Sequence, residues 1–284
     1  MRRFSIPNSY FDFLMDRSLV LPLAGTLLAL TTAALSGCEK DASSTTATGK
    51  FTLHLDNGTF VPGANGPIFS PLVLGSGSYT NANSDDFRVS TFKYYVSNVK
   101  LLKADNSAYT LPNAYYLVDQ AKPATQDLEM AGIPVGDYTA ISFVVGVDSA
   151  RTKAGNFTED ALNANSGMLW TMNGVDEFIN LAMTGYSSKS PSGGLTFHVA
   201  GYKHSTTNTI RTVTVPFPAA NSPMLVRPDH SPEIHLYADI NKLFTGRNAI
   251  KFADTYNVMG GAPAVKIADN IAADMFSVGH IHAN

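Results

Sequence analysis

Phe87-Arg-Val-Ser-Thr-Phe-Lys-Tyr-Tyr-Val-Ser-Asn-Val-Lys-Leu-Leu102 is a long stretch of aromatic and β-branched residues. Such residues favour β-strands, because their side chains pack well on a pleated and half-buried surface. Asp105-Asn106 follows the stretch and signals a turn. The segment therefore predicts a long strand in a domain built mainly from strands.

Further strand signals lie on both sides of this segment. Phe51, Leu53 and Leu55 alternate with polar residues, which is typical of a half-buried strand, and Asn57-Gly58 supplies a tight turn. Other strands are predicted at 114–118, 138–147, 195–200, 209–217 and 233–239. Helix signals are confined to three short segments, at 156–162, 240–244 and 268–276.

These patterns predict a mainly β fold. We expect an antiparallel β-sandwich with Greek-key-like connections, a few short helices, and a long irregular insertion at 150–190. The 44% hydrophobic content is enough for a substantial core. Neither an internal repeat nor a Pro/Ser-rich linker divides the chain, so residues 51–284 are expected to form one domain.

The N-terminal region has the features of a bacterial lipoprotein signal. An apolar run from Leu19 ends at Leu35-Ser-Gly-Cys38, a lipobox that contains the only cysteine of the chain. The run is short and contains Pro22 and Gly25, which disfavours a permanent membrane span. We therefore expect residues 1–37 to be a signal peptide, Cys38 to carry a thioether-linked lipid, and residues 38–50 to form a flexible tether.

This interpretation places the protein in the bacterial cell envelope, facing the periplasm and anchored to a membrane. Glu39 follows the lipidated cysteine, which favours the outer membrane over retention in the inner membrane. With no second cysteine in the chain, core packing and not an intramolecular disulfide must hold the domain together. A formal net charge of −3 and the absence of a long basic run argue against nucleic acid as a partner.

The candidate chemistry lies in histidines, because no nucleophile, phosphate-binding or metalloprotease motif occurs in the chain. His54, His198 and His235 each occupy a polar position in a predicted strand, where a rigid backbone can hold an imidazole for copper or zinc. The alternative is that each is an ordinary surface histidine. His280-Ile-His282 would place two imidazoles on one face if extended, although a frayed tail is the simpler interpretation so close to the C-terminus.

The strand at 87–101 resembles the signature strand of the MbnP-like family, whose members are periplasmic or lipid-anchored proteins named from methanobactin operons. Other matching blocks follow in the family's order along the chain, from about Phe51 to the C-terminus. These blocks are Tyr115–Asp119, Ile133–Ser149, Gly167–Trp170, Phe197–Gly201, Thr209–Val213 and Ile267–Phe276.

The resemblance implies copper handling in the periplasm. In the family a tryptophan can be oxidised to kynurenine by a partner, a dihaem cytochrome peroxidase of the MbnH type, and kynurenine and histidines then bind copper. The matching positions here are Trp170 in Gly-Met-Leu-Trp, His198 in Phe-His-Val-Ala-Gly, and His54 in the first strand. Kynurenine has an aryl amine and a carbonyl that indole lacks, so the oxidation would create a metal ligand. The residues after Trp170 depart from the aromatic-rich pattern of the family.

The sequence thus predicts a lipid-anchored copper carrier or scavenger that is not an enzyme. Its metal site is predicted to use His54, His198 and Trp170. We expect the two histidines on neighbouring strands, with Trp170 reaching the same place from the insertion.

Two alternatives belong to other functional classes. One is a metal-free surface module that binds glycan or protein ligands through exposed tyrosines, namely Tyr79, Tyr109, Tyr186 and Tyr202. The other is a hydrolase with carboxylates from the insertion and its surroundings, namely Glu159, Asp160, Asp176 and Glu177.

Overall fold

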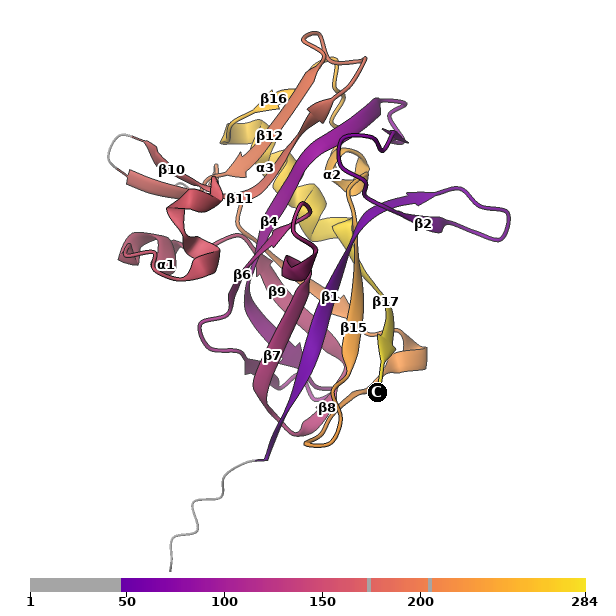
Figure 1. Ribbon diagram of the computed structural model, residues 1–284, viewed down its shortest axis with the longest axis vertical. Coiled ribbons are helices and arrows are strands. Elements are labelled where there is room, and N and C mark those ends of the chain that lie inside the picture. The colour runs from indigo at the N-terminus through magenta and orange to yellow at the C-terminus, as the bar shows by residue number, and fades with distance from the viewer. Residues whose placement is uncertain (1–46, 173–174, 204–205) are drawn as a thin grey trace, which may run out of the picture. The chain divides into compact units, whose positions relative to one another are not determined.

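The computed structural model describes residues 47–172, 175–203 and 206–284, and Figure 1 shows their arrangement. The predicted signal peptide, the lipidation at Cys38 and most of the predicted tether lie outside the described residues. The first strand begins at Thr48, somewhat before the predicted Phe51. No helix in the described part of the chain is long and apolar enough to cross a membrane.

A five-stranded sheet, which we call the small sheet, is built around β1. In it β17, β15, β1 and β2 lie side by side, and β7 also pairs with β1. The pairing of β1 with β15 is parallel and the other pairings are antiparallel. The bounds are β1 Thr48–Val61, β2 Ile68–Pro71, β7 Asp127–Pro134, β15 Glu233–Asp239 and β17 Phe276–His282.

A ten-stranded sheet, which we call the large sheet, follows the order β13-β9-β4-β11-β12-β16, with β3, β5 and β6 also paired to β4 and β10 paired to β11. The long strand predicted from residue 87 is β4, at the centre of this sheet. The bounds are β3 Tyr79–Thr80, β4 Asp86–Leu102, β5 Ala108–Thr110, β6 Tyr115–Asp119, β9 Ala140–Val145, β10 Leu169–Met172, β11 Val175–Tyr186, β12 Gly194–Ala200, β13 Arg211–Pro216 and β16 Asn257–Val258.

The remaining elements are short. A two-stranded pair joins β8 Gly136–Tyr138 to β14 Met224–Val226. The α-helices are α1 Ser149–Ala154, α2 Lys242–Thr245 and α3 Gly261–Asn270, and a π-helical turn, Ile271–Met275, continues α3. Single 3₁₀ turns occur at Pro123–Thr125, Asp160–Leu162, Ala164–Ser166 and Ala219–Asn221.

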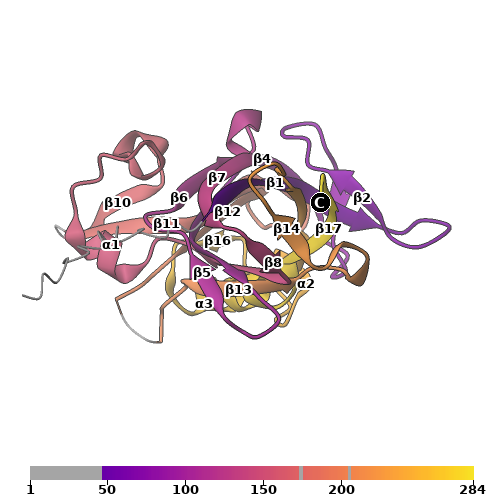
Figure 2. The same cartoon turned by 90° about the horizontal axis from the view of Figure 1, so that it is seen from below.

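The mainly β class with few short helices is confirmed, but the purely antiparallel sandwich is not. The small sheet and the large sheet are both mixed. In the small sheet β1 pairs in parallel with β15, and in the large sheet β12 pairs in parallel with β16. The strands also curl around the core as a half-barrel, as the end view in Figure 2 shows. The reason lies in the connections, because a strand can pair in parallel with one that follows it only after a long crossover through other elements.

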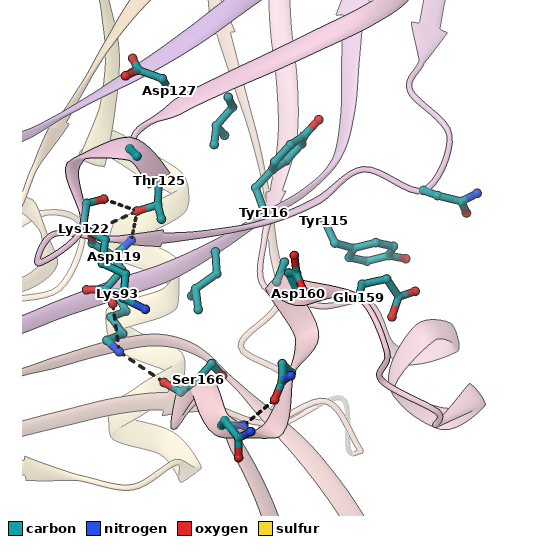
Figure 3. Close-up of a pocket in the computed structure, with 17 residues that line it drawn as sticks. Lys93, Tyr115, Tyr116, Asp119, Lys122, Thr125, Asp127, Glu159, Asp160 and Ser166 are labelled. Atoms are coloured by element: carbon teal, nitrogen blue, oxygen red, sulfur yellow. Dashed lines mark hydrogen bonds and ion pairs between the residues drawn. The ribbon is translucent and has the colours of Figure 1, made fainter.

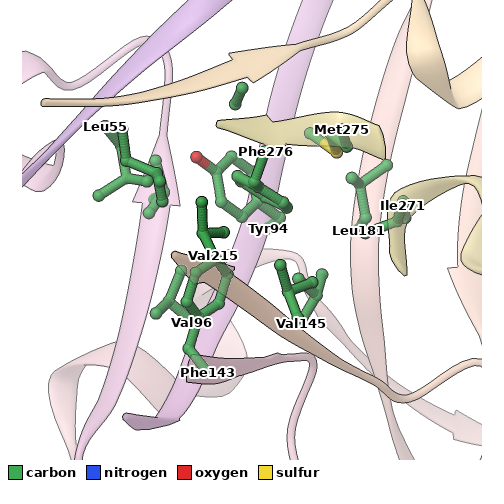
Figure 4. Packing of buried hydrophobic residues seen from close by; sticks show 14 of the residues in the cluster. Leu55, Tyr94, Val96, Phe143, Val145, Leu181, Val215, Ile271, Met275 and Phe276 are labelled. Atoms are coloured by element: carbon green, nitrogen blue, oxygen red, sulfur yellow. The ribbon is translucent and has the colours of Figure 1, made fainter. Parts of the chain in front are cut away.

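The main core fills the space between the two sheets (Figure 4). Tyr94 of β4 and Phe143 of β9 both contact Phe276 of β17, with ring centroids 5.9 and 5.1 Å apart. The Tyr94 hydroxyl donates a hydrogen bond of 2.9 Å to Asn57 Oδ1, and burial raises the pKa of this tyrosine well above its ordinary value. Each fully buried side chain of this size contributes about 1.5–3 kcal/mol of hydrophobic stabilisation.

A second, smaller hydrophobic core packs against β11, and the segment predicted to be an insertion supplies part of it. It contains Tyr95, Leu162, Met168 and Phe178, and Trp170 packs against it. The segment from α1 to β10 is therefore an added layer that covers one face of the large sheet. The insertion is shorter than predicted, because β11, within 150–190, is an integral strand of that sheet.

Candidate metal site

Three neighbouring strands of the small sheet place their histidines in one row. His54 of β1 is the register partner of His235 of β15, and His235 is in turn the partner of His280 of β17. The flanking Leu53, Leu55, Ile234 and Leu236 are buried, so the alternation of a strand turns the histidines to the opposite, outer face. The apolar alternation that builds the core thereby also builds this row.

A β-bulge at Gly279 sets the direction of the β17 side chains. The register shifts between His235 and Leu236, so that Gly279 has no partner in β15. Without this extra residue, His280 would share a face with Phe276, which is buried. The bulge resets the alternation, and both His280 and His282 join the row on the outer face.

The imidazoles of the row lie close to one another. The ring centroids of His54 and His235 are 4.8 Å apart, and those of His235 and His280 are 4.4 Å apart in a stacked arrangement. His282 meets His235 edge-on at 5.0 Å, and its Nε2 is 2.8 Å from Nε2 of His280. We call His54, Asp56, His235, His280 and His282 the histidine cluster.

Carboxylates lie within the histidine cluster and beside it. Asp56 lies between two rings, with Oδ1 3.3 Å from His54 Nε2 and Oδ2 2.9 Å from His235 Nδ1. The other nitrogen of each ring also meets a carboxylate, since His54 Nδ1 is 2.5 Å from Asp127 and His235 Nε2 is 3.1 Å from Glu233. Carboxylates only accept hydrogen bonds, so this arrangement favours imidazolium or a bound cation.

The pKa values within the histidine cluster diverge. Burial disfavours the charged form of His54, but the hydrogen bond to Asp127 and the negative charges of Asp56, Asp127 and Glu233 outweigh burial and raise its pKa. For His280, burial and the neighbouring rings of His235 and His282 lower the pKa. The His54 side of the cluster therefore attracts positive charge, whereas His280 is readily available as a neutral ligand.

Trp170 and His198 form a separate pair on the large sheet. Their rings meet edge-on with centroids 5.4 Å apart, where β10 and β12 flank β11. His198 Nδ1 is buried and has no hydrogen-bond partner among the described residues, and burial lowers the pKa of this histidine. An unpaired nitrogen beside the indole suits a metal or a modified Trp170, because a buried polar atom without a partner is unfavourable.

The prediction that His54 and His198 lie on neighbouring strands is wrong. His54 belongs to the small sheet and His198 to the large sheet. Of the three predicted metal ligands, the structure therefore brings only Trp170 and His198 into contact. His54 has other histidine neighbours instead. His235 is central to the histidine cluster, and His280 and His282 lie in a paired strand and not in a frayed tail.

A pocket of about 700 Å³ has Asp127, the partner of His54, in its lining (Figure 3). Its Lys93 pairs with Asp119 at 3.1 Å and donates a hydrogen bond to the Ser166 carbonyl. Of the four carboxylates considered for a hydrolase, Asp160 lines this pocket beside Glu159, and the other three have separate partners. Glu159 pairs with Arg151, Asp176 accepts a hydrogen bond from Thr171, and Glu177 lies 3.7 Å from Lys203.

The tyrosines considered for a binding module do not form an exposed set. Tyr79 is buried, and Tyr109 and Tyr202 are half-buried with hydroxyls that donate to backbone carbonyls. Tyr186 is 54% exposed. The expectation that all four are exposed is therefore wrong, since strand alternation and loop packing cover three of them.

Comparison with known proteins supports the resemblance seen in the sequence. The MbnP family model matches residues 48–260, and no curated protein matches the chain. Among solved structures, MbnP from Methylosinus trichosporium matches with a TM-score of 0.52 and 13% identity, over 82% of this chain and 99% of that chain. At this identity the likeness shows the fold. Because the family model covers most of the sequence, the chain belongs to the MbnP family.

Proposed function

We propose that this protein binds copper at the histidine cluster and acts as a carrier or scavenger in the bacterial cell envelope, without catalytic activity of its own. The observation that carries the proposal is the row of imidazoles from His54 through His235 to His280. Imidazole nitrogen is a preferred ligand of copper, and copper(II) is the most tightly bound divalent ion of the first transition row. The resemblance to MbnP-like proteins points to the same metal.

The exposure of the histidine cluster fits a carrier. The side chains of His54, Asp56 and His235 are 27%, 26% and 19% exposed, so an ion can enter and leave without opening the core. The ligands nevertheless stand on paired strands, and the backbone holds them in place. A rigid but accessible site suits reversible uptake of metal.

Copper titration of the purified protein tests this proposal. Replacing His54, His235 and His280 together by alanine should weaken copper(II) binding by more than about 100-fold, since losing only a group that orients a ligand costs about 10–100-fold. His230→Ala is the matched control, because His230 is exposed and lies beside Asp229 outside the cluster. Equal affinity of the triple variant and the wild type would exclude the histidine cluster as the copper site.

We also propose that Trp170 is the site of oxidation to kynurenine by a dihaem cytochrome peroxidase of the MbnH type. The edge-on contact with His198 and the unpaired Nδ1 of that histidine support a ligand-forming role for this position. Intact-mass measurement and peptide mapping should locate the modification on Trp170 when the protein and such a peroxidase are produced together. Trp170→Phe is the control, and an unmodified Trp170 in the presence of the active peroxidase would contradict the proposal.

A further inference from the structure

Each ring nitrogen of His235 lies beside a carboxylate. Nδ1 lies 2.9 Å from Asp56, on the side of His54, and Nε2 lies 3.1 Å from Glu233, whose register partner is His282. A neutral imidazole has a proton on only one nitrogen. In the neutral ring, the nitrogen without a proton therefore faces a carboxylate and has no hydrogen to donate. That nitrogen needs a second proton or a bound cation to satisfy the carboxylate.

The histidine cluster divides into two sets of ligands at His235. His54, Asp56 and His235 form one triad, and His235, His280 and His282 form the other, with the ligand atoms in each triad within 4.8 Å of one another. Among the residues that the structure describes, no such set joins His54 to His280 or His282. β15 separates the two flanking strands, and neighbouring strands are about 4.8 Å apart. One ion therefore cannot be held by every histidine of the cluster as they stand.

We propose that the histidine cluster holds two metal ions bridged by the His235 ring, a proposal that rests on the proposed metal-binding function. Nδ1 of His235 binds the first ion together with His54 and Asp56. Nε2 binds the second ion together with His280 and His282. With metal–nitrogen bonds of about 2 Å, the two ions lie roughly 6 Å apart across the ring.

The proton balance of this arrangement is simple. The first ion binds the lone pair of the neutral His235 ring, which keeps its remaining N–H. The second ion displaces that proton to solvent, and His235 becomes a bridging imidazolate. Asp56 within the cluster and Asp127 and Glu233 beside it offset the positive charge of the two ions.

The rival arrangement is a single ion on the β17 side. Asp56 would then only orient His235 through Nδ1, as carboxylates often do for histidine ligands, and Nε2 would bind the ion with His280 and His282. His54 would bind no metal. This arrangement predicts one ion in the cluster and no change in that number when His54 is replaced.

Counting bound ions separates the two arrangements. All proteins should carry His198→Ala, so that any ion held beside Trp170 is not counted. After loading with copper(II) and dialysis, we expect two ions in this parent protein. We expect one ion after adding His54→Ala, one after adding His282→Ala, and none held through dialysis after adding His235→Ala. His230→Ala should keep both ions.

Electron paramagnetic resonance tests the bridge itself. Two copper(II) ions joined by His235 should be coupled, so the doubly loaded parent should lose most of the signal of an isolated copper(II) ion. The signal should return in the His54→Ala variant. A parent with one ion, or with two uncoupled ions, would overturn the bridge and leave the proposed function standing. A parent that binds no copper would overturn the proposed function itself.

Discussion

Within the histidine cluster, the surroundings of His54 and His280 move the pKa values of these two imidazoles in opposite directions. His54 lies between Asp127 and Asp56, and these negative charges raise its pKa in spite of burial. His280 has no carboxylate within salt-bridge distance among the described residues, and burial beside two other rings lowers its pKa. His54 thus competes more strongly for a proton, whereas His280 stays available for a metal.

Asp127→Asn should lower the pKa of His54 in the metal-free protein, because the amide keeps the shape of the side chain but removes its charge. Since folding raises this pKa, the contribution of His54 to stability is complete below the ordinary histidine pKa of about 6.5 and is lost as the pH rises through the raised value. The variant should therefore lose stability at acidic pH and little at alkaline pH. NMR titration of the imidazole and thermal melts at several pH values measure both effects.

Glu129→Gln is the control for this experiment. Glu129 is exposed on the same strand as Asp127 and its register partner is Thr52, so the neutral substitution should leave the titration of His54 close to that of the wild type. An unchanged His54 pKa in Asp127→Asn would show that this carboxylate does not control the charge of the histidine.

At the level of elements, the strands that alternate were predictable and the doubly buried strand was not. β15 spans Glu233–Asp239, as its alternation predicts. β11 has six consecutive buried residues, Phe178–Met183, because the main core covers one face and the smaller core covers the other. Alternation disappears when both faces are buried, so the sequence indicated an irregular insertion there.

Which strands pair with one another was harder to predict from the sequence than where the strands lie. The pattern around His280 and His282 is compatible with a strand, but nothing local shows that β17 pairs with β15 or that Gly279 forms a bulge. The sequence places His54 and His235 at polar positions of predicted strands, yet their parallel pairing depends on a long crossover. The candidate ligands could therefore be found in the sequence, whereas their grouping could not.

Gly185→Ala should weaken the junction between β11 and β4. A Cβ at this position would lie 2.0 Å from the backbone oxygen of Arg88, next to a register shift in the β11–β4 pairing. The backbone must move to accept the methyl group, which costs about 1–3 kcal/mol in a packed region. A thermal melt should show a clearly lower Tm, and copper binding should be kept because the histidine cluster is on the other sheet.

Gly194→Ala provides the matched control on β12. Its Cβ would meet no atom closer than Ser192 Oγ at 3.8 Å, so the change in stability should stay within about 0.5 kcal/mol. Equal melting temperatures of the two variants would show that the close approach at Gly185 does not constrain the sheet.

For the whole molecule, the two sheets separate two candidate sites. The small sheet carries the histidine cluster, and the large sheet carries the pair of Trp170 and His198. In the sequence, His54 and His198 occupy equivalent polar positions within strands, which made one shared site the simpler hypothesis. The two histidines belong to strands of different sheets, so the two candidate sites can be mutated independently.

The lipobox predicts that Cys38→Ser releases the whole protein from the membrane without changing its fold. Cys38 precedes Thr48, where β1 begins, and all residues of the histidine cluster come after that point. Each buried methylene of an attached acyl chain contributes about 0.8 kcal/mol to membrane binding, and removing the lipidated residue removes that term. Detergent fractionation of host cells should find the variant in the soluble fraction with an unchanged Tm and unchanged copper binding. Ser43→Ala, in the same segment, should stay in the membrane. Wild-type protein that is soluble and carries no lipid would refute the lipobox. The proposal of copper binding does not depend on this outcome, but the proposed membrane anchor does.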